Sequence, residues 1–465
     1  MAQRIHFSGI GGTAMLAGAR LAIEAGHEVR GSDGVLYPPA SHMVASLGVP
    51  VYTGYDAANL AWNPDLVIIG NALSRGNPEV EHILSRKIPY ASLAEWLKRH
   101  VLLQRQSIVL SGTHGKTTTT ALTAHILKQR FPGLGYLIGG EALGFEHSSY
   151  LGSPSAPFVI EGDEYDTAFF DKRAKFLHYL PDIALVTSLE FDHGDIYRDL
   201  EEIETAFQRM FRQIPQEGLV LLCADNHART LASHAFSPVE SYGFSYGADW
   251  FATYVKLPDG FQLEVSYKGK TWGRVPLSLA GKHNHQNILA ALAIAVTLGM
   301  PQKAIAQAIA AFPGVRRRME VFLQHDDIIF VDDFAHHPTA IRGSLEAAQS
   351  RWPDRRIVAL IEPRSNTMVT RRFQKELFQS LQLADLVFLG PVHRSERIPE
   401  AERLDRYGLI HSLVNYGKEA YYDEDVPALL DRLLPVLQNG DLVLIMSNGA
   451  FGGIYGLLKE RFAGE

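Results

Sequence analysis

The sequence has little cysteine and no long apolar run. Cys223 is the only cysteine among its 465 residues, which excludes an internal disulfide and a zinc site built from cysteines, and favours a reducing compartment. No stretch approaches the roughly 20 consecutive apolar residues of a membrane-spanning helix, and the apolar run near the N-terminus is too short for a signal peptide. We therefore expect a cytoplasmic protein with no membrane insertion.

Excess positive charge is also missing. The formal net charge is −7 at pH 7, so no overall basic field attracts nucleic acid or anionic membranes, and we expect no nucleic-acid partner. Hydrophobic residues make up 46% and charged residues 20% of the chain, which is typical of a globular protein, and the length suffices for about three domains. The sequence does not indicate an oligomeric state.

Short apolar runs alternate with longer segments of helical period along most of the chain. Such runs, bounded by glycine or polar residues, predict buried strands of parallel sheets with helices on both faces. The pattern recurs three times with different loops, so we expect an α/β fold of three domains. These are an N-terminal Rossmann-like domain (1–104), a central P-loop ATPase-type parallel sheet (105–313) and a C-terminal Rossmann-like domain (314–465).

One segment departs from this pattern. Residues 250–281 alternate in places with a period of two and contain two glycine-based turn signals, which is typical of hairpins. We expect a small antiparallel sheet inside or beside the central domain.

A phosphate-binding loop stands in residues 111–120, "SGTHGKTTTT". An expected strand precedes two glycines, and Lys116 and Thr117 open an expected helix, whose N-terminus favours anions. Lys116 can neutralise ATP phosphates and the Thr117 hydroxyl can bind Mg²⁺. The full G-x-x-x-x-G-K-[ST] form is not met, because Leu110 stands at its first glycine, and the alternative is a helix N-terminus with a capping threonine. The candidate ATP-binding residues of the loop are Gly112, Thr113, Gly115, Lys116, Thr117 and Thr118.

Acidic residues follow the next two expected strands. "EGDEYD" (161–166) and "LEFDH" (189–193) stand where the carboxyl ends of parallel strands meet and ligands bind. Hard cations prefer oxygen ligands, so Glu164 and His193 join Thr117 as candidate magnesium-site residues. The alternative for any single acid is a solvated loop.

The N-terminal "GIGGTA" (9–14) follows an expected strand. It resembles a dinucleotide fingerprint, with Ala14 in place of the third glycine, which that fingerprint allows. Taken alone it would suggest NAD, and an NAD-dependent oxidoreductase is one alternative for the whole chain. A UDP diphosphate makes similar demands on a helix N-terminus, and the phosphate loop downstream favours UDP.

Several motifs together resemble one family. "GTHGKTTT", "EGDEYD", "LEFDH", "GKHNHQN", "RRRMEV" and "VDDFAHHP" occur in the order seen in the Mur ligases, the ATP-dependent amide-bond ligases of bacterial cell-wall synthesis. The resemblance extends from residue 4 to about residue 455. It implies ATP and Mg²⁺ as cofactors and a reaction through an acyl-phosphate intermediate.

Two branches of that family share "GIGGTAM". One adds L-alanine to UDP-N-acetylmuramate, and the other attaches the murein tripeptide L-alanyl-γ-D-glutamyl-meso-diaminopimelate to the same nucleotide sugar in peptidoglycan recycling. The chain resembles the second in "GSDGVLYPP", "EPRSNTM" and "MSNGAFGGI". The L-alanine ligase is the nearest alternative. A non-catalytic, nucleotide-binding regulatory protein is a third.

The resemblance also implies roles for single residues. The first domain would bind the UDP-sugar, the central one ATP and the third one the incoming peptide, which would face Arg364. Lys116, Glu164, His193 and His336 would be catalytic, and His193, His336 or His337 could be the general base. Further ATP-binding residues would be His283, Asn284, Asn287, Arg317, Arg318 and Asp333. The UDP-sugar would contact Gly9, Gly11, Gly12, Ser32, Asp33 and Asn71.

Lysine is missing between Lys175 and Lys256. Several branches of the family support a second magnesium ion with a carbamylated lysine shortly after the position of His193. Such a lysine is excluded in this window, in agreement with the branches that use UDP-N-acetylmuramate.

Overall fold

The computed structural model divides into two compact units. The first contains residues 1–191, 199–278 and 286–314, and the second 192–198, 279–285 and 315–465. The structure describes residues 2–36, 40–192, 194, 196–258, 260–393 and 398–463. His193, a predicted site residue, lies outside the described residues. The unit boundary at 314/315 falls in the expected join between the central and C-terminal domains.

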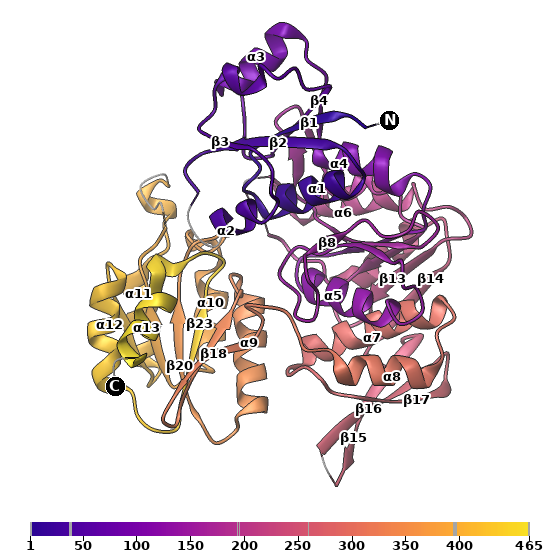
Figure 1. Cartoon of the computed structure of the whole chain (residues 1–465). Coiled ribbons are helices and arrows are strands. Elements are labelled where there is room, and N and C mark those ends of the chain that lie inside the picture. The colour runs from indigo at the N-terminus through magenta and orange to yellow at the C-terminus, as the bar shows by residue number, and fades with distance from the viewer. Residues whose placement is uncertain are drawn as a thin grey trace. The chain divides into compact units, whose positions relative to one another are not determined.

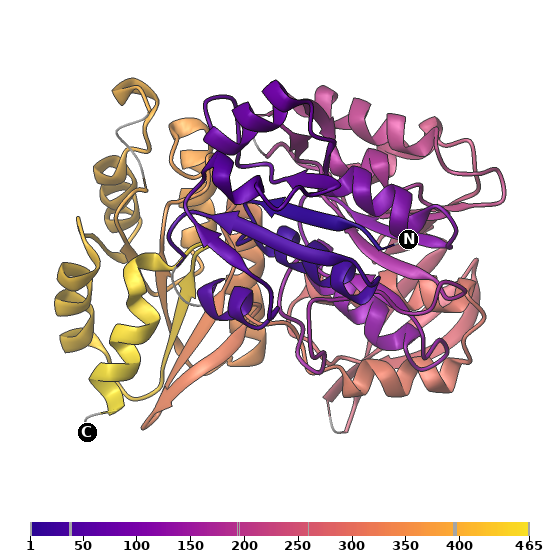
Figure 2. The same cartoon turned by 45° about the horizontal axis from the view of Figure 1, so that its top comes forward.

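The N-terminal sheet of unit 1 has five parallel strands in the order β3-β2-β1-β4-β5. Its order reverses between β1 and β4, and the Gly9–Gly12 turn leaves β1 at that point, where ligands bind in such sheets. Figure 2 shows these strands, in indigo, across the front of the molecule. The strands are β1 (Arg4–Ser8), β2 (Glu28–Asp33), β3 (Val51–Thr53), β4 (Leu66–Ile69) and β5 (Tyr90–Ser92), and the helices are α1 (Thr13–Glu24), α2 (Ala40–Ala45), η1 (Ala57–Leu60), α3 (Pro78–Arg86) and α4 (Leu93–Leu97).

The central sheet of unit 1 has ten strands in the order β17-β16-β15-β14-β13-β12-β6-β9-β7-β8. Strands β14 to β7 in that order are parallel, and their fully buried residues account for the continuous apolar runs of the sequence. The parallel strands are β6 (Ser107–Ser111), β7 (Gly135–Leu137), β9 (Phe158–Gly162), β12 (Ile183–Val186), β13 (Leu219–Cys223) and β14 (Val239–Gly243). The helices are α5 (Lys116–Leu127), α6 (Leu200–Phe211), α7 (Lys282–Thr297) and α8 (Gln302–Ala311). The first residues of α7, 282–285, belong to unit 2.

The expected antiparallel strands within residues 250–281 are present, but they extend the central sheet and do not form a separate one. β15 (Trp250–Leu257), β16 (Gly260–Tyr267) and β17 (Lys270–Pro276) pair antiparallel, and β15 also pairs parallel with β14. Figure 1 shows the β15–β16 hairpin projecting beyond α7 and α8. At the other side of the sheet, β8 (Ser149–Tyr150) pairs antiparallel with β7. A separate hairpin of β10 (Asp166–Ala168) and β11 (Asp171–Ala174) follows β9.

Unit 2 is a six-stranded sheet between two layers of helices, in the order β18-β19-β23-β20-β21-β22. Alternate residues of β20 enter two separate apolar cores: one contains side chains of α9, α10 and α11, the other those of α12 and α13. All its strand pairs are parallel except β18–β19. Its strands are β18 (Glu320–His325), β19 (Ile328–Asp333), β20 (Arg356–Ile361), β21 (Leu386–Leu389), β22 (Glu419–Tyr422) and β23 (Asp441–Met446). Its helices are α9 (Pro338–Arg351), α10 (Gln374–Leu381), α11 (Arg406–Asn415), α12 (Val426–Leu433) and α13 (Ile454–Ala463).

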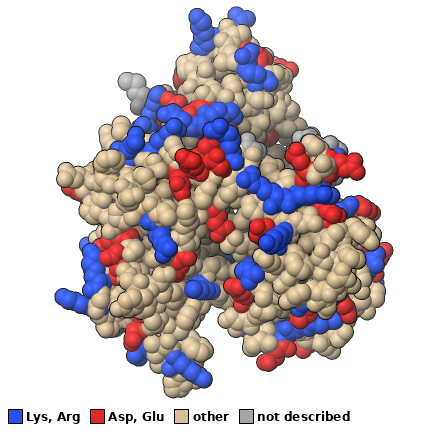
Figure 3. Space-filling model, turned by 180° about the vertical axis from the view of Figure 1, so that it is seen from behind, with Lys and Arg blue, Asp and Glu red and all other residues tan. Residues whose placement is uncertain are grey.

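The α/β fold with parallel sheets is therefore confirmed, while the boundaries 104/105 and 313/314 stay a prediction. Among the described residues no helix combines the length and apolar character needed to cross a bilayer. On the face shown in Figure 3, Lys and Arg side chains are interspersed with Asp and Glu.

Candidate active site

The phosphate loop connects β6 to α5 in unit 1. Gly112 has φ +123° and Gly115 has φ +83°, left-handed conformations that favour glycine. A Cβ atom at Gly115 would lie 2.7 Å from Oδ1 of Asn287 in α7. Two positions of the loop therefore require glycine, and the predicted Asn287 packs directly against it.

Lys116 is enclosed by the loop and by carboxylates. Its Nζ donates to the carbonyl oxygen of Gly112 at 2.7 Å and to Oε2 of Glu164 at 2.8 Å. Burial works to lower the pKa of Lys116, but the carboxylates of Glu164 and Asp163 outweigh it and hold this pKa above its ordinary value. The side chain is therefore a fixed cation beneath the loop. The structure brings together Lys116 and Glu164, two of the predicted catalytic residues.

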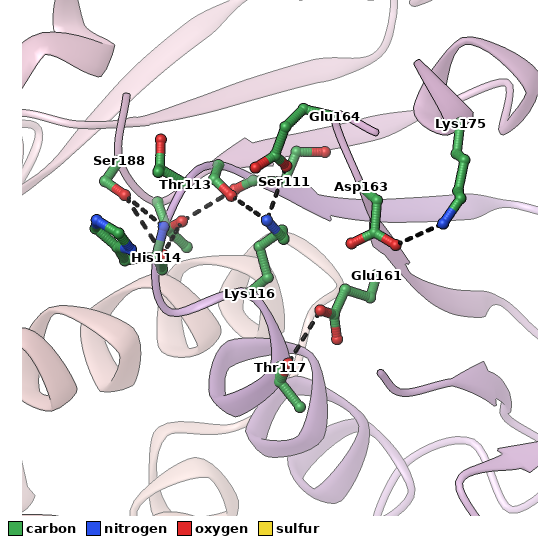
Figure 4. A network of polar contacts seen from close by, with 12 residues as sticks. Ser111, Thr113, His114, Lys116, Thr117, Glu161, Asp163, Glu164, Lys175 and Ser188 are labelled. Carbon is green, nitrogen blue, oxygen red and sulfur yellow. Dashed lines mark hydrogen bonds and ion pairs between the residues drawn. The ribbon is translucent and has the colours of Figure 1, made fainter. Parts of the chain in front are cut away.

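Thr117 is held by an acid that the sequence did not single out. Its hydroxyl donates to Oε1 of Glu161 at 3.0 Å (Figure 4). The other oxygen of Glu161 accepts the N–H of Gly139 at 2.8 Å. Burial and the nearby Asp163 carboxylate raise the pKa of Glu161 to about 6. The Thr117 hydroxyl and the Glu161 carboxylate thus form one oxygen-rich corner of the site.

These oxygen donors fit a divalent cation and ATP phosphates. Glu161, Asp163 and Glu164 gather at the end of β9, with Lys175 forming an ion pair with Asp163 at 3.2 Å (Figure 4). Burial, followed by the neighbouring Asp163 carboxylate, raises the pKa of Glu161, and a hard cation bound to these oxygens would favour the charged carboxylates. Lys116 and the helix N-terminus at Gly115 supply the positive charge that phosphates require.

The loop after β12 braces the phosphate loop from the other side. The N–H of Thr113 donates to the carbonyl oxygen of Ser188 at 3.0 Å, and the N–H of His114 to the Ser188 hydroxyl at 2.9 Å. The N–H of Glu190 in turn donates to the Thr113 hydroxyl at 2.9 Å. Thr113 is therefore placed by the segment that leads to His193.

The glycine turn of the N-terminal sheet lies against Asp33. Gly9 has φ +85°, and the N–H of Gly11 donates to Oδ2 of Asp33 at 2.6 Å. A Cβ atom at Gly11 would lie 2.9 Å from the same oxygen, so this close approach requires glycine. Gly12 is the N-cap of α1. The structure thus brings together the predicted Gly9, Gly11, Gly12 and Asp33.

Ser32, which is predicted to lie near the sugar nucleotide, points into the N-terminal domain. Its side chain is fully buried and donates to Oε2 of Glu79 at 2.6 Å, so its hydroxyl faces the domain interior. Asn71 is exposed, and its amide donates to Oδ1 of Asp166 in β10 at 3.0 Å. Asn71 is thereby tied to the acidic segment that begins with Glu161.

Two residues predicted to bind ATP are held within unit 2. The buried Asp333 carboxylate accepts the N–H groups of Met319 and Ala335 and the hydroxyl of Ser344 at 2.8–2.9 Å. The guanidinium of Arg317 pairs with Asp332 at 3.1 Å and donates to two carbonyl oxygens after β23. The polar atoms of both side chains therefore bind other groups of unit 2 and fix the conformation of its loops.

Three further residues predicted to bind ATP, Arg318, Asn284 and His283, also have contacts within unit 2. The guanidinium of Arg318 lies 4.7 Å from the ring centre of Phe334. In unit 2, Asn284 donates its amide to the carbonyl oxygen of Ala280 at 2.8 Å, and a Cβ atom at Gly343 would lie 3.1 Å from Nδ1 of His283. His283 thus packs against α9.

The two adjacent histidines of unit 2 differ in tautomer. Nδ1 of His336 lies 2.7 Å from the carbonyl oxygen of Phe334. A carbonyl oxygen only accepts, so Nδ1 carries the proton and Nε2 is the basic nitrogen of the neutral ring. His337 is the N-cap of α9, and its Nδ1 accepts the N–H of Thr339 at 3.3 Å. Its neutral ring therefore carries the proton on Nε2, and the geometry suits His336 better as a proton acceptor.

Arg364 lies where the strand order of unit 2 reverses. β23, the last strand in sequence, lies between β19 and β20, and Ile361 and Met446 are in register at the ends of β20 and β23. Arg364 follows β20, donates to Oε1 of Glu362 at 3.4 Å, and its side chain is one third exposed. Ligands of such sheets bind at this point, and a guanidinium there suits a carboxylate.

Comparison with known proteins identifies the family. Residues 4–105 match "Mur ligase family, catalytic domain", residues 110–295 match "Mur ligase middle domain", and residues 317–449 match "Mur ligase, glutamate ligase domain". The chain belongs to the Mur ligase family.

Individual Mur ligases resemble the chain over its whole length. It is 41% identical over 99% of its residues, and 98% of the relative, to the UDP-N-acetylmuramate–L-alanyl-γ-D-glutamyl-meso-2,6-diaminoheptandioate ligase of Escherichia coli K12. It is 33% identical to a UDP-N-acetylmuramate–L-alanine ligase of Geotalea uraniireducens, over 100% of the chain and 99% of the relative. The crystal structure of a murein peptide ligase from Psychrobacter arcticus matches with a TM-score of 0.75 and 37% identity, over 100% of this chain and 99% of that one. The family predicted from the motifs is therefore confirmed.

Proposed function

We propose that this Mur ligase joins UDP-N-acetylmuramate to L-alanyl-γ-D-glutamyl-meso-diaminopimelate, with conversion of ATP to ADP and phosphate. The observation that carries the proposal is the 41% identity to the ligase of that specificity, against 33% to an L-alanine ligase of similar coverage. A tripeptide added in one step is a preformed fragment of the cell wall, so the activity belongs to peptidoglycan recycling.

The phosphate loop would hold ATP and Mg²⁺. Thr117 and Glu164, with Glu161 beside Thr117, offer the oxygen ligands for the metal, which when bound neutralises phosphate charge. A free carboxylate is a poor acyl donor, so the lactyl carboxylate first attacks the γ-phosphate of ATP. The bond to the β-phosphate oxygen breaks, which gives an acyl phosphate and ADP. Lys116 offsets the repulsion between the carboxylate and the γ-phosphate, and the buried pair with Glu164 keeps its ammonium in place.

The second step needs a neutral amine and a bound peptide. The α-amine of the peptide attacks the acyl carbon, and phosphate leaves. His336 can accept the amine proton through Nε2, because Nδ1 is bound to a carbonyl oxygen; His193 remains the other candidate. Arg364 can bind a carboxylate of the anionic peptide.

Phosphate release tests the proposal. Purified protein with ATP, Mg²⁺ and UDP-N-acetylmuramate should release phosphate with the tripeptide and little with free L-alanine. Lys116→Ala is the negative control, and Lys128→Ala, at the exposed end of the same helix, should behave as wild type. Turnover with L-alanine but not the tripeptide would indicate the L-alanine ligase, and nucleotide binding without phosphate release would indicate the regulatory protein.

A further inference from the structure

A buried carboxylate lies beneath the glycine turn of the N-terminal sheet. Glu79, in α3 (Figure 1), has no exposed surface. Its Oε2 accepts the hydroxyls of Ser8 and Ser32, each at 2.6 Å, and lies 3.6 Å from Nε2 of His6. Its Oε1 accepts the amide of Asn59 at 2.7 Å. One side chain therefore joins β1, β2, η1 and α3.

The residues that bind Glu79 stand next to the predicted ligand loop. Ser8 directly precedes Gly9, and Ser32 directly precedes Asp33, whose carboxylate accepts the N–H of Gly11. The amide of Asn59 also donates to the carbonyl oxygen of Gly54 at 3.0 Å.

The loop after β3, which Asn59 contacts at Gly54, also binds Asp33. The N–H of Gly54 donates to the carbonyl oxygen of Asp33 at 2.6 Å, and the hydroxyl of Tyr55 to Oδ1 of Asp33 at 2.9 Å. The three loops at this edge of the sheet are thus connected through Glu79.

Glu79 is charged although it is enclosed. Burial works to raise the pKa of Glu79, but the nearby His6 and the hydrogen bonds of Ser32, Ser8 and Asn59 hold it below its ordinary value. An enclosed carboxylate is tolerated only when its donors are fixed around it. Fixing Ser8 and Ser32 also fixes the backbone from which the glycine turn and Asp33 emerge.

We propose that Glu79 is a positioning residue that holds the Gly9–Gly12 turn and Asp33 in the geometry that binds the diphosphate of the nucleotide sugar. The inference rests on the proposed function. Glu79 does not touch the ligand; it acts through Ser8, Ser32 and Asn59. A glutamine at this position has one acceptor oxygen instead of two, so one group of donors loses its partner and the loop loosens.

Calorimetric titration with UDP and with UDP-N-acetylmuramate tests this role. Glu79→Gln should weaken the binding of both about tenfold, as when one well-placed hydrogen bond to a charged group is lost. The KM for the nucleotide sugar should rise similarly, whereas kcat and the affinity for ADP should stay unchanged. Glu81→Gln is the matched control, because Glu81 lies in the same helix and binds Arg75 and the Gly76 N–H at the surface.

The outcomes separate the possible explanations. A direct effect of the Glu79 charge on the diphosphate would tighten binding in Glu79→Gln, since a negative charge is removed; tighter or unchanged binding overturns the proposal. If Glu79→Gln does not fold, Ser32→Ala removes one donor with little change in volume and should weaken UDP binding in the same direction, and unchanged affinity there is equally contradictory. A wild-type protein that binds neither UDP nor the sugar nucleotide contradicts the proposed function instead.

Discussion

Arg364 follows β20 and is held by two long contacts, to Oε1 of Glu362 and to Nδ1 of His393, each at 3.4 Å, so its guanidinium can exchange these partners for a carboxylate of the peptide. Arg364→Ala should raise the KM for the tripeptide roughly 10- to 100-fold, the range for losing hydrogen bonds between charged groups, and leave the KM for ATP unchanged. Steady-state kinetics with each substrate varied in turn measures both. Arg342→Ala, which removes an exposed arginine of α9, is the control, and an unchanged peptide KM in Arg364→Ala would count against this role.

His336 and His337 offer a comparison between adjacent residues with opposite tautomers. His336→Gln should lower kcat about 100-fold or more, the lower end for loss of a general base, without raising the KM for ATP. His337→Gln should instead lower the free energy of unfolding by about 1 kcal/mol, because the α9 cap is lost. Rates and denaturation curves for both variants separate these effects. Equal losses of kcat would leave His193 as the candidate base.

At the scale of the element, the start of α7 makes the stability of unit 2 sensitive to acid. Nε2 of His285 donates to the carbonyl oxygen of Leu279 at 2.9 Å, and burial lowers the pKa of His285 to about 4. The unfolded chain takes up this proton below about pH 6.5, whereas the folded protein resists it until about pH 4. The contribution of His285 to the free energy of unfolding is therefore fully present above about pH 6.5, and it is lost as the pH falls from there to about 4.

The expected loss is about 2 kcal/mol of unfolding free energy between pH 7 and pH 5. Denaturant unfolding of the wild type and of His285→Gln at both pH values measures this loss. The unfolding free energy of the variant should fall by about 2 kcal/mol less than that of the wild type. His411→Gln, at an exposed position of α11, is the control. Identical pH dependence in wild type and His285→Gln would show that His285 is not responsible.

The sequence predicts elements better than the directions of their side chains. β6, the phosphate loop and α5 were predictable because glycine, lysine and strand signals are local. Glu161 was not distinguishable from Asp163 and Glu164, since only the folded end of β9 shows which acid meets Thr117. The hydrogen bond between Ser32 and Glu79 could not be predicted either, because it joins positions 47 residues apart in the sequence. The addition of the hairpin strands to the central sheet could not be predicted either. It depends on the parallel pairing of β15 with β14, whereas the turn signals indicate only the antiparallel hairpins.

At the scale of the whole molecule, the assigned residues belong to different units. Lys116 and Glu164 lie in unit 1, whereas Arg318, His336 and Arg364 lie in unit 2. If all of them serve one reaction, we expect the units to close when the substrates bind. We expect a smaller radius of gyration in solution scattering when an ATP analogue and UDP-N-acetylmuramate are both added. Lys116→Ala under the same conditions is the control, and scattering curves that do not change with ligands contradict closure.

The ten-stranded sheet of unit 1 also has a consequence for colloidal behaviour. Its two terminal strands, β17 and β8, each pair with one neighbour, and an unpaired strand edge is a template for aggregation. β17 carries Lys270, Arg274 and Pro276, and β8 has only two residues. The charged side chains of β17 and the missing N–H of its proline oppose the addition of a further strand at that edge, and the short β8 offers few groups to pair with at the other. The ten-stranded sheet of the folded enzyme is therefore protected against edge-to-edge association.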